Sequence, residues 1–344
     1  MSETALLVVA PAWVGDLVMS QVLLKHLRQK RPAVAIDVLA PVGVAPLVRR
    51  MPEVRKVIEG PFRHGELSLL KRIKLGRKLR SAGYAQALVL PNSWKSALVP
   101  WFAGVPIRTG WKGEWRYGLL NDMRALSTQQ LPQMAQRFLA LGTEHRAPLP
   151  SLQSPRLQVD TRMARRLAER LGLQPGRPLL ALCPGAAFGG AKRWPVKHFA
   201  DLAQYYLRRG WQAVVCGGSA DRDLAKSLAE QLGQGRCVNS AGLTSLEEVV
   251  DVLSLTTAVV SNDSGLMHIA AAVNRPLLAL YGPTSPGFTP PLAEHAAILS
   301  IPLDCAPCFE RECPLAHHRC MNELKPHIAA AKLDELLSVA GGQA

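Results

Sequence analysis

Three loops, each after a run of apolar residues, carry side chains suited to acid–base or phosphate chemistry. The first is residues 11–16 (PAWVGD), in which Asp16 follows a glycine. A carboxylate at that place can take a proton from an attacking hydroxyl group. Asp is also a common residue at the N-cap of a helix, so Asp16 could instead begin the helix that follows. The residue pattern leaves both roles open.

The second loop, residues 184–195 (PGAAFGGAKRWP), combines glycines with a single lysine. Glycines such as Gly185 allow the backbone to approach a ligand closely, and Lys192 can place a point charge on a phosphate. The loop lacks the Gly-Lys-Ser/Thr of a Walker sequence. The alternative is a solvated basic loop with no ligand.

The third loop, residues 260–268 (VSNDSGLMH), leads from an apolar run into an apolar helix. Ser264 and Gly265 would place free N–H groups at the positive end of that helix, which suits a diphosphate. Asp263 and His268 add polar groups, although a lone His on such a helix is more often structural.

A fourth turn, residues 216–221 (CGGSAD), has the same strand-to-helix character. Gly217 would allow close approach of a ligand, and Asp221 could accept a hydrogen bond from a ribose hydroxyl. Asp221 could equally cap the following helix.

The elements that must position these loops follow a βαβ pattern. Seven short runs rich in Val, Leu, Ala and Ile are typical of buried parallel strands: 5–11, 35–40, 87–91, 179–183, 213–217, 258–261 and 277–281. Amphipathic segments that predict helices lie between most of them: 17–30, 196–209, 222–232 and 246–255. This alternation predicts an α/β protein with doubly wound parallel sheets, in which ligands bind beyond the carboxyl ends of the strands.

Length and charge predict two domains that differ in electrostatics. The chain of 344 residues carries a net charge of +15. Residues 1–171 hold 27 Lys and Arg against 11 Asp and Glu, whereas residues 172–344 hold 14 against 15. Because prolines also bracket the helical stretch 161–171, we predict domains at 1–171 and 172–344. The last amphipathic segment, 323–339, could return to the first domain. A basic half concentrates anionic partners, whether nucleic acid, membrane or phosphorylated substrate.

The apolar stretches are all too short to cross a bilayer, which takes roughly 20 residues. The start of the chain also lacks a basic region before its first apolar run. We therefore expect a cytoplasmic protein.

The seven cysteines form two groups. Cys183, Cys216 and Cys237 lie in apolar surroundings and are expected to be buried. The others are clustered near two histidines, and their spacing permits a tetrahedral zinc site: Cys305, Cys308, Cys313 and Cys320. The cluster lacks the paired C-x-x-C units of a zinc ribbon, so reduced, packed thiols are the expectation and metal is the alternative.

Taken together, these loops resemble those of the ADP-heptose:lipopolysaccharide heptosyltransferases, which are inverting glycosyltransferases of the GT-B fold. The matching pieces span most of the chain in the family's order: Gly15 with Asp16, 184–195, 261–268 and 281–284 (YGPT). The resemblance implies two Rossmann-like domains facing across a cleft, the first binding the acceptor and the second ADP-heptose. Residues 11–16 and 305–314 (CAPCFERECP) most resemble members that add the second heptose of the inner core.

The resemblance implies a role for each loop. Asp16 matches the catalytic base and Lys192 the phosphate contact, so heptose would leave ADP by direct displacement at its anomeric carbon. No cofactor or metal is implied. The residues expected at the donor are Gly15, Gly185, Gly217, Asp221, Asp263, Ser264, Gly265 and His268.

The implied acceptor is strongly anionic, because it consists of lipid A, acidic Kdo sugars and a first heptose at the inner face of the inner membrane. The candidates for binding it are Arg63, Lys71, Arg72 and Lys95. Residues 71–80 (KRIKLGRKLR) predict one basic helix, which could contact the acceptor or the membrane or could simply be solvated.

Two other functions compete with this interpretation. A family member that adds the first or third heptose would differ only in its acceptor. A basic nucleic-acid-binding protein is the alternative from another class, but aromatic residues are only 6% of the chain and no nucleic-acid-binding motif is present, so nucleic acid is not an expected partner. A dehydrogenase would need a G-x-G-x-x-G after a strand, which the sequence lacks.

Overall fold

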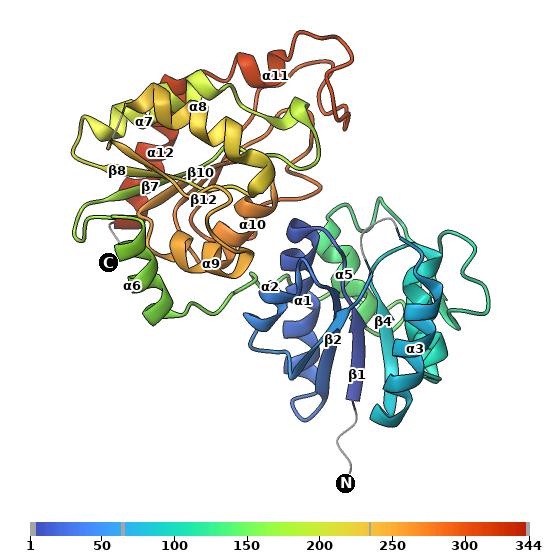
Figure 1. Cartoon of the computed structure of the whole chain (residues 1–344). Coiled ribbons are helices and arrows are strands. Elements are labelled where there is room, and N and C mark those ends of the chain that lie inside the picture. The colour runs from blue at the N-terminus through green and yellow to red at the C-terminus, as the bar shows by residue number, and fades with distance from the viewer. Residues whose placement is uncertain (1–4, 63–65, 234, 342–344) are drawn as a thin grey trace. The chain divides into compact units, whose positions relative to one another are not determined.

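The computed structural model describes residues 5–62, 66–233 and 235–341, which form two compact units (Figure 1). The units are Met1–Pro155 and Arg156–Ala344, so the boundary predicted between 171 and 172 is wrong. The reason is helix α6, Thr161–Arg170, whose buried face packs on helix α9, Leu246–Ser254, of the second unit. The side chain of Asp160 caps α6, and its backbone N–H donates to Asp251.

The first unit contains one parallel sheet of six strands in the order β3-β2-β1-β4-β5-β6. The strands are β1 Ala5–Val9, β2 Ala35–Pro41, β3 Lys56–Gly60, β4 Tyr84–Val89, β5 Ile107–Trp111 and β6 Asp122–Arg124. The helices are α1 Val14–Lys30, α2 Ala45–Arg49, α3 Leu69–Leu79, α4 Leu98–Phe102 and α5 Met134–Gly142, with 3₁₀ turns η1 Arg80–Ala82 and η2 Trp94–Ala97. Helices α1 and α5 pack together on one face of the sheet, and α3 lies with α4 on the other (Figure 1). The strand order reverses between β1 and β4, which is where doubly wound sheets bind ligands.

The second unit repeats this plan, with the strand order β12-β11-β10-β7-β8-β9, all parallel. The strands are β7 Leu179–Cys183, β8 Gln212–Val215, β9 Cys237–Asn239, β10 Ala258–Asn262, β11 Leu277–Leu280 and β12 Ala296–Leu299. The remaining helices are α7 Val196–Leu207, α8 Arg222–Leu232, α10 Gly265–Ala272, α11 Arg319–Asn322 and α12 Pro326–Gly341, with 3₁₀ turns η3 Gly190–Lys192 and η4 Ser219–Asp221. One face of the sheet carries α7, α8 and α12, and the other carries α9 and α10 (Figure 1).

The last helix belongs to the second unit. Helix α12 packs on α7, β11 and β12, and Tyr206 of α7 donates a hydrogen bond of 2.8 Å to Asp334 of α12. The buried Leu333 completes a core that also contains Trp194 and Phe199. The segment for which the sequence allowed a return to the first domain is thus part of the second unit.

The described helices include none that combines the length and the apolar character needed to cross a membrane.

Candidate active site

Asp16 stands at the edge of the first sheet where β1 ends. All five residues of β1 are buried, and the chain turns at Pro11 into α1, which begins at Val14. Trp13 occupies the N-cap position, so Asp16 is not the cap that the alternative predicted but lies within the first helical turn. A carboxylate in the first turn of a helix is favoured by the helix dipole.

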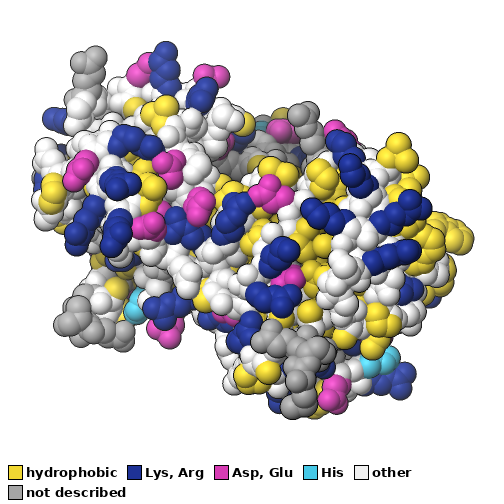
Figure 2. Space-filling model, turned by 60° about the horizontal axis from the view of Figure 1, so that its bottom comes forward, with side chains coloured by type: hydrophobic (Ala, Val, Ile, Leu, Met, Phe, Trp, Pro, Cys, Tyr) yellow, Lys and Arg dark blue, Asp and Glu magenta, His cyan; other side chains and the backbone are white. Residues whose placement is uncertain are grey.

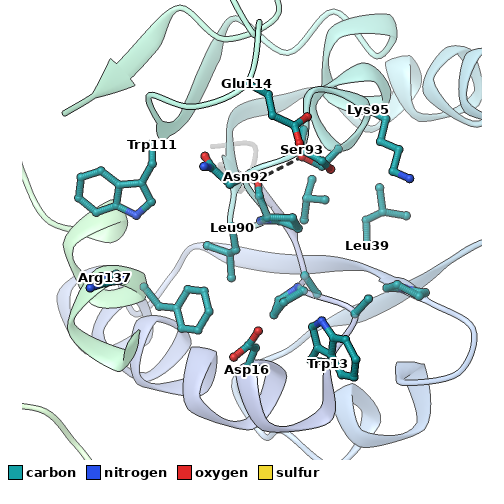
Figure 3. Close-up of a pocket in the computed structure, with 18 of the residues that line it drawn as sticks. Trp13, Asp16, Leu39, Leu90, Asn92, Ser93, Lys95, Trp111, Glu114 and Arg137 are labelled. Carbon is teal, nitrogen blue, oxygen red and sulfur yellow. Dashed lines mark hydrogen bonds between the residues drawn. The ribbon is translucent and has the colours of Figure 1, made fainter. Parts of the chain in front are cut away.

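Asp16 faces a cavity of about 620 Å³ in the first unit. Figure 3 shows its carboxylate on one wall, with Asn92, Ser93 and Glu114 on the wall opposite. The cavity therefore lies beyond the carboxyl ends of β1 and β4, at the reversal of strand order. Its cationic lining residues are Arg72, Lys95, Lys112 and Arg137.

The residues predicted to bind the acceptor differ in their positions relative to this cavity. Lys95 lines it, and so does Arg72, but the Arg72 guanidinium is buried and donates to the carbonyl oxygens of Leu67 and Lys95 at 2.6 and 3.0 Å. Arg72 therefore supports the cavity wall, and burial lowers its pKa. Lys71 is exposed on α3 and is not a lining residue. Arg63 lies outside the described residues.

The cavity also contains polar residues that the sequence analysis missed. Asn92 and Ser93 lie in the loop after β4, which ends at Val89, and the rule that finds polar groups beyond strand ends could have identified them. Glu114 accepts a hydrogen bond of 2.7 Å from the backbone N–H of Trp94. Arg137 lies inside α5, where the sequence gives no signal for it.

In the second unit, Lys192 forms a buried ion pair with Asp263. The Lys192 Nζ lies 2.6 Å from Asp263 Oδ2, and the two side chains are 12% and 5% exposed. Thr284 donates a hydrogen bond of 2.6 Å to the same carboxylate oxygen. The three residues come from three loops, so this network joins the loops after β7, β10 and β11. Thr284 belongs to a motif noted in the sequence, but its role here was missed.

Asn262 ties two of these loops together. Its side-chain N–H₂ donates to the carbonyl oxygen of Pro184 at 2.7 Å, and its side-chain oxygen accepts from the backbone N–H of Trp194 at 3.1 Å. The side chain is fully buried, so both ends of the loop 184–195 are fixed to β10. Asn262 was not among the site residues predicted from the sequence.

The helix that begins next to Asp263 presents its N-terminus as predicted. Ser264 is the N-cap of α10 in an extended conformation, Gly265 is the first helical residue, and the Ser264 side chain makes no capping hydrogen bond. The N–H groups of the first turn are thus suited to an anion. His268 is buried on this helix, and burial lowers its pKa to about 4; the Asp263 charge opposes this shift and the Lys192 charge adds to it. His268 is therefore neutral at pH 7.

Asp221 caps its own turn. Its Oδ2 accepts a hydrogen bond of 2.9 Å from Gly218 N, and the same carboxylate lies against two glycines. A Cβ atom on Gly185 would come within 2.5 Å of Asp221 Oδ1, and one on Gly217 within 2.8 Å of Asp221 Cβ. The structure thus brings together three of the predicted donor residues. Gly15 is instead in the first turn of α1, in the first unit, whereas the other donor candidates all belong to the second.

Comparison with known proteins identifies the family. Residues 72–318 match the model of glycosyltransferase family 9 (heptosyltransferase). The chain belongs to this family. It is 43% identical to lipopolysaccharide heptosyltransferase 2 of Escherichia coli K12, over 96% of this chain and 98% of that protein. It is 44% identical to lipooligosaccharide heptosyltransferase 2 of Haemophilus influenzae, over 97% and 99% of the two chains.

The fold agrees with this family assignment. The structure of E. coli ADP-heptose lps heptosyltransferase II matches with a TM-score of 0.88 and 40% identity, over 98% of this chain and all of that one. The two parallel six-stranded sheets are thus the GT-B type of α/β architecture that was predicted. This member of glycosyltransferase family 9 is an enzyme that transfers a sugar.

The predicted burial of the cysteines of this glycosyltransferase holds only in part, because Cys305 is exposed and Cys308, Cys313 and Cys320 are half-buried. Cys183 and Cys216 are buried, and Cys237 is half-buried. All seven cysteines are free thiols. Within the described ranges, no group of three or more His, Cys, Asp and Glu side chains is arranged to hold a metal ion.

Proposed function

We propose that this glycosyltransferase moves L-glycero-D-manno-heptose from ADP-heptose to the first heptose of the lipopolysaccharide inner core, as a heptosyltransferase II. The observation that carries the proposal is the identity of 43–44% to heptosyltransferase 2 enzymes over nearly the whole of both chains. Two features, one in each unit, also support it: a carboxylate in a cavity of the first unit and a buried lysine beside a helix N-terminus of the second.

The second unit binds ADP-heptose. The N-terminus of α10 and the ammonium group of Lys192 hold the diphosphate, and Asp263 with Thr284 fixes the position of that ammonium group. As the bond between the anomeric carbon and the diphosphate oxygen breaks, negative charge grows on the departing ADP. Fixed positive groups in a partly buried site stabilise such charge without reorganising.

The first unit binds the acceptor. Asp16 takes the proton from the attacking hydroxyl of the acceptor heptose, whose oxygen then bonds to the anomeric carbon from the face opposite ADP. The configuration at that carbon is inverted, and the products are ADP and the extended core. Lys95, Lys112 and Arg137, which line the Asp16 cavity, supply positive charge for the acidic acceptor sugars.

The surface of the first unit supports peripheral contact with the inner face of the inner membrane. The unit holds 22 Lys and Arg against 9 Asp and Glu, and α3 carries four exposed basic residues and no acidic one. Large apolar side chains are exposed on the same unit, with Leu70 at 81% and Trp115 at 88%. On the right of Figure 2, where the first unit is seen, Lys and Arg side chains are interspersed with hydrophobic ones. Basic and apolar groups together favour an anionic bilayer surface.

The test is ADP release from ADP-heptose with three acceptors, Kdo-lipid A carrying no, one or two heptoses. We expect turnover with the mono-heptosylated acceptor alone and a loss of at least 100-fold in Asp16→Asn, the range of general-base catalysis. Glu144→Gln, an exposed carboxylate of the same unit, is the matched control and should retain activity. Turnover only with another acceptor would reassign the step, and turnover with none would refute the proposal.

A further inference from the structure

The segment Cys305 to Cys320, here called the Cys-rich segment, is bound to the loop that carries Lys192. The carbonyl oxygen of Arg311 accepts a hydrogen bond of 3.0 Å from the backbone N–H of Ala191. The Glu312 carboxylate accepts one of 3.1 Å from the backbone N–H of Gly190. Both bonds hold the short turn η3, Gly190–Lys192, whose last residue is Lys192. The position of this turn therefore depends on a segment more than 100 residues later in the chain.

Two glycines of the loop make this contact possible. A Cβ atom on Gly189 would lie 2.2 Å from the carbonyl oxygen of Arg311, and one on Gly190 would lie 2.9 Å from a Glu312 carboxylate oxygen. At position 189 a side chain would collide with the backbone of Arg311, and at position 190 it would displace the Glu312 carboxylate. Gly189 and Gly190 thus allow the Cys-rich segment to pack closely against the loop. The sequence pattern had instead suggested that the loop glycines make room for a ligand.

An aromatic ring adds a third contact on the same side. The ring of Phe188 lies 4.8 Å from Lys192 Nζ and 5.6 Å from the guanidinium carbon of Arg311. Cations are attracted to aromatic faces at such distances. Phe188 therefore contacts both the Cys-rich segment and the catalytic lysine.

The same segment reaches the loop that carries Thr284. The backbone N–H of Phe309 donates a hydrogen bond of 2.7 Å to the carbonyl oxygen of Pro283, and the rings of Phe309 and Phe288 are 6.3 Å apart, edge to face. Thr284 in turn donates to Asp263, the partner of Lys192. The segment therefore touches two of the three loops that meet in the Lys192 network.

We propose that the Cys-rich segment is a positioning element for donor binding, with Glu312 and Arg311 acting through η3 on Lys192 and with Phe309 acting through Pro283 on Thr284. Neither Glu312 nor Arg311 is a catalytic residue in this account. Loosening the segment shifts the Lys192 ammonium group relative to Asp263 and weakens binding of the nucleotide diphosphate. The inference rests on the proposed function only for the identity of the sugar, because ADP alone reports on the diphosphate contacts.

The experiment compares Glu312→Ala with Glu312→Gln and with Glu310→Ala. The Gln side chain keeps an oxygen that can accept from Gly190, and Glu310 is an exposed carboxylate two residues away, outside the described hydrogen bonds to the loop. Calorimetry gives the Kd for ADP, and steady-state kinetics give the KM for donor and for acceptor separately. We expect Glu312→Ala to raise the ADP Kd and the donor KM about 3- to 10-fold, the effect of losing a charge-assisted hydrogen bond, with the acceptor KM unchanged. Glu312→Gln should recover most of this loss.

Gly189→Ala is the second variant, because its new methyl group must displace Arg311. It should weaken ADP binding at least as much as Glu312→Ala does, at a temperature where the melting curve shows the protein folded. If the Kd for ADP in Glu312→Ala and in Gly189→Ala equals that of wild type and of the control Glu310→Ala, the proposal is overturned. If wild type turns over with none of the heptose acceptors, the proposed function fails, but the ADP measurements still decide this inference.

Discussion

The buried pair of Lys192 and Asp263 yields a prediction of its coupling energy. The two charges are 2.6 Å apart and nearly inaccessible to water, so removal of either partner leaves a charge without its counter-ion. Such a loss costs roughly 3–5 kcal/mol of unfolding free energy, whereas removal of both partners leaves no unpaired charge and costs no more than removal of one. If Lys192→Met and Asp263→Asn each cost about 3 kcal/mol, the double variant should also cost about 3 rather than 6 kcal/mol. The expected coupling is therefore about 3 kcal/mol.

The assay is urea unfolding of the four members of the cycle, followed by tryptophan fluorescence, in which the buried Trp194 reports on the second unit. The exposed pair Lys332–Glu335, 2.8 Å apart in the same unit, provides a matched cycle. Exposed pairs typically contribute below about 1 kcal/mol. Additive effects of the single variants at Lys192 and Asp263, or a coupling no larger than that of the exposed pair, would contradict this prediction.

Three further predictions concern titration and charge. Burial lowers the pKa of His268 from 6.5 to about 4, so the unfolded state binds the proton first as the pH falls. We therefore expect the free energy of unfolding to fall by up to about 3 kcal/mol between pH 6.5 and pH 4 in wild type but not in His268→Gln. Denaturant unfolding at each pH measures this. Backbone N–H groups, that of His318 foremost, lower the pKa of the Cys313 thiol, and burial raises that of Cys320. Iodoacetamide should therefore alkylate Cys313 at lower pH than Cys320 in a mass-spectrometric time course, and the reverse order would contradict this. Reversing three basic residues of α3 to Glu should weaken binding to anionic vesicles and use of the acceptor while leaving the Kd for ADP unchanged, and unchanged acceptor kinetics would remove the role proposed for α3. The three residues are Lys74, Arg77 and Lys78.

The central strands could be predicted from the sequence because both their faces are covered. Strands β1 and β7 consist wholly of buried residues and appear in the sequence as continuous apolar runs. The missed strands β3, β5, β6, β9 and β12 lie toward the edges of the sheets, where exposed or polar residues such as Lys56 and Asp122 interrupt the apolar pattern. Short apolar runs predict the middle of a parallel sheet but not its edges.

The loops of the candidate site could be located from the sequence, but their contacts could not. The position of Asp263 after a strand marked it as a candidate, yet its partner Lys192 is 71 residues away, and no local pattern indicates that pairing. The domain boundary failed for the same reason, because the hydrogen bond from Asp160 to Asp251 that draws α6 into the second unit spans 91 residues. Long-range pairings of polar groups follow from the packed fold.

The two units use positive charge in different ways, and the difference fits the two substrates of the proposed reaction. With the boundary after Pro155, the first unit carries 13 excess positive charges and the second, with 19 Lys and Arg against 17 Asp and Glu, only two. Exposed charges of the first unit create a field that attracts an anionic acceptor but is screened by salt. In the second unit a single lysine, fixed by Asp263, lies where the donor loops meet. A buried, fixed charge cannot attract a distant ligand strongly, but it can stabilise charge that develops on a leaving group. Attraction of the acceptor therefore calls for exposed positive charges, whereas cleavage of the donor calls for a buried and fixed one. The near-neutral second unit contains the lysine suited to cleavage.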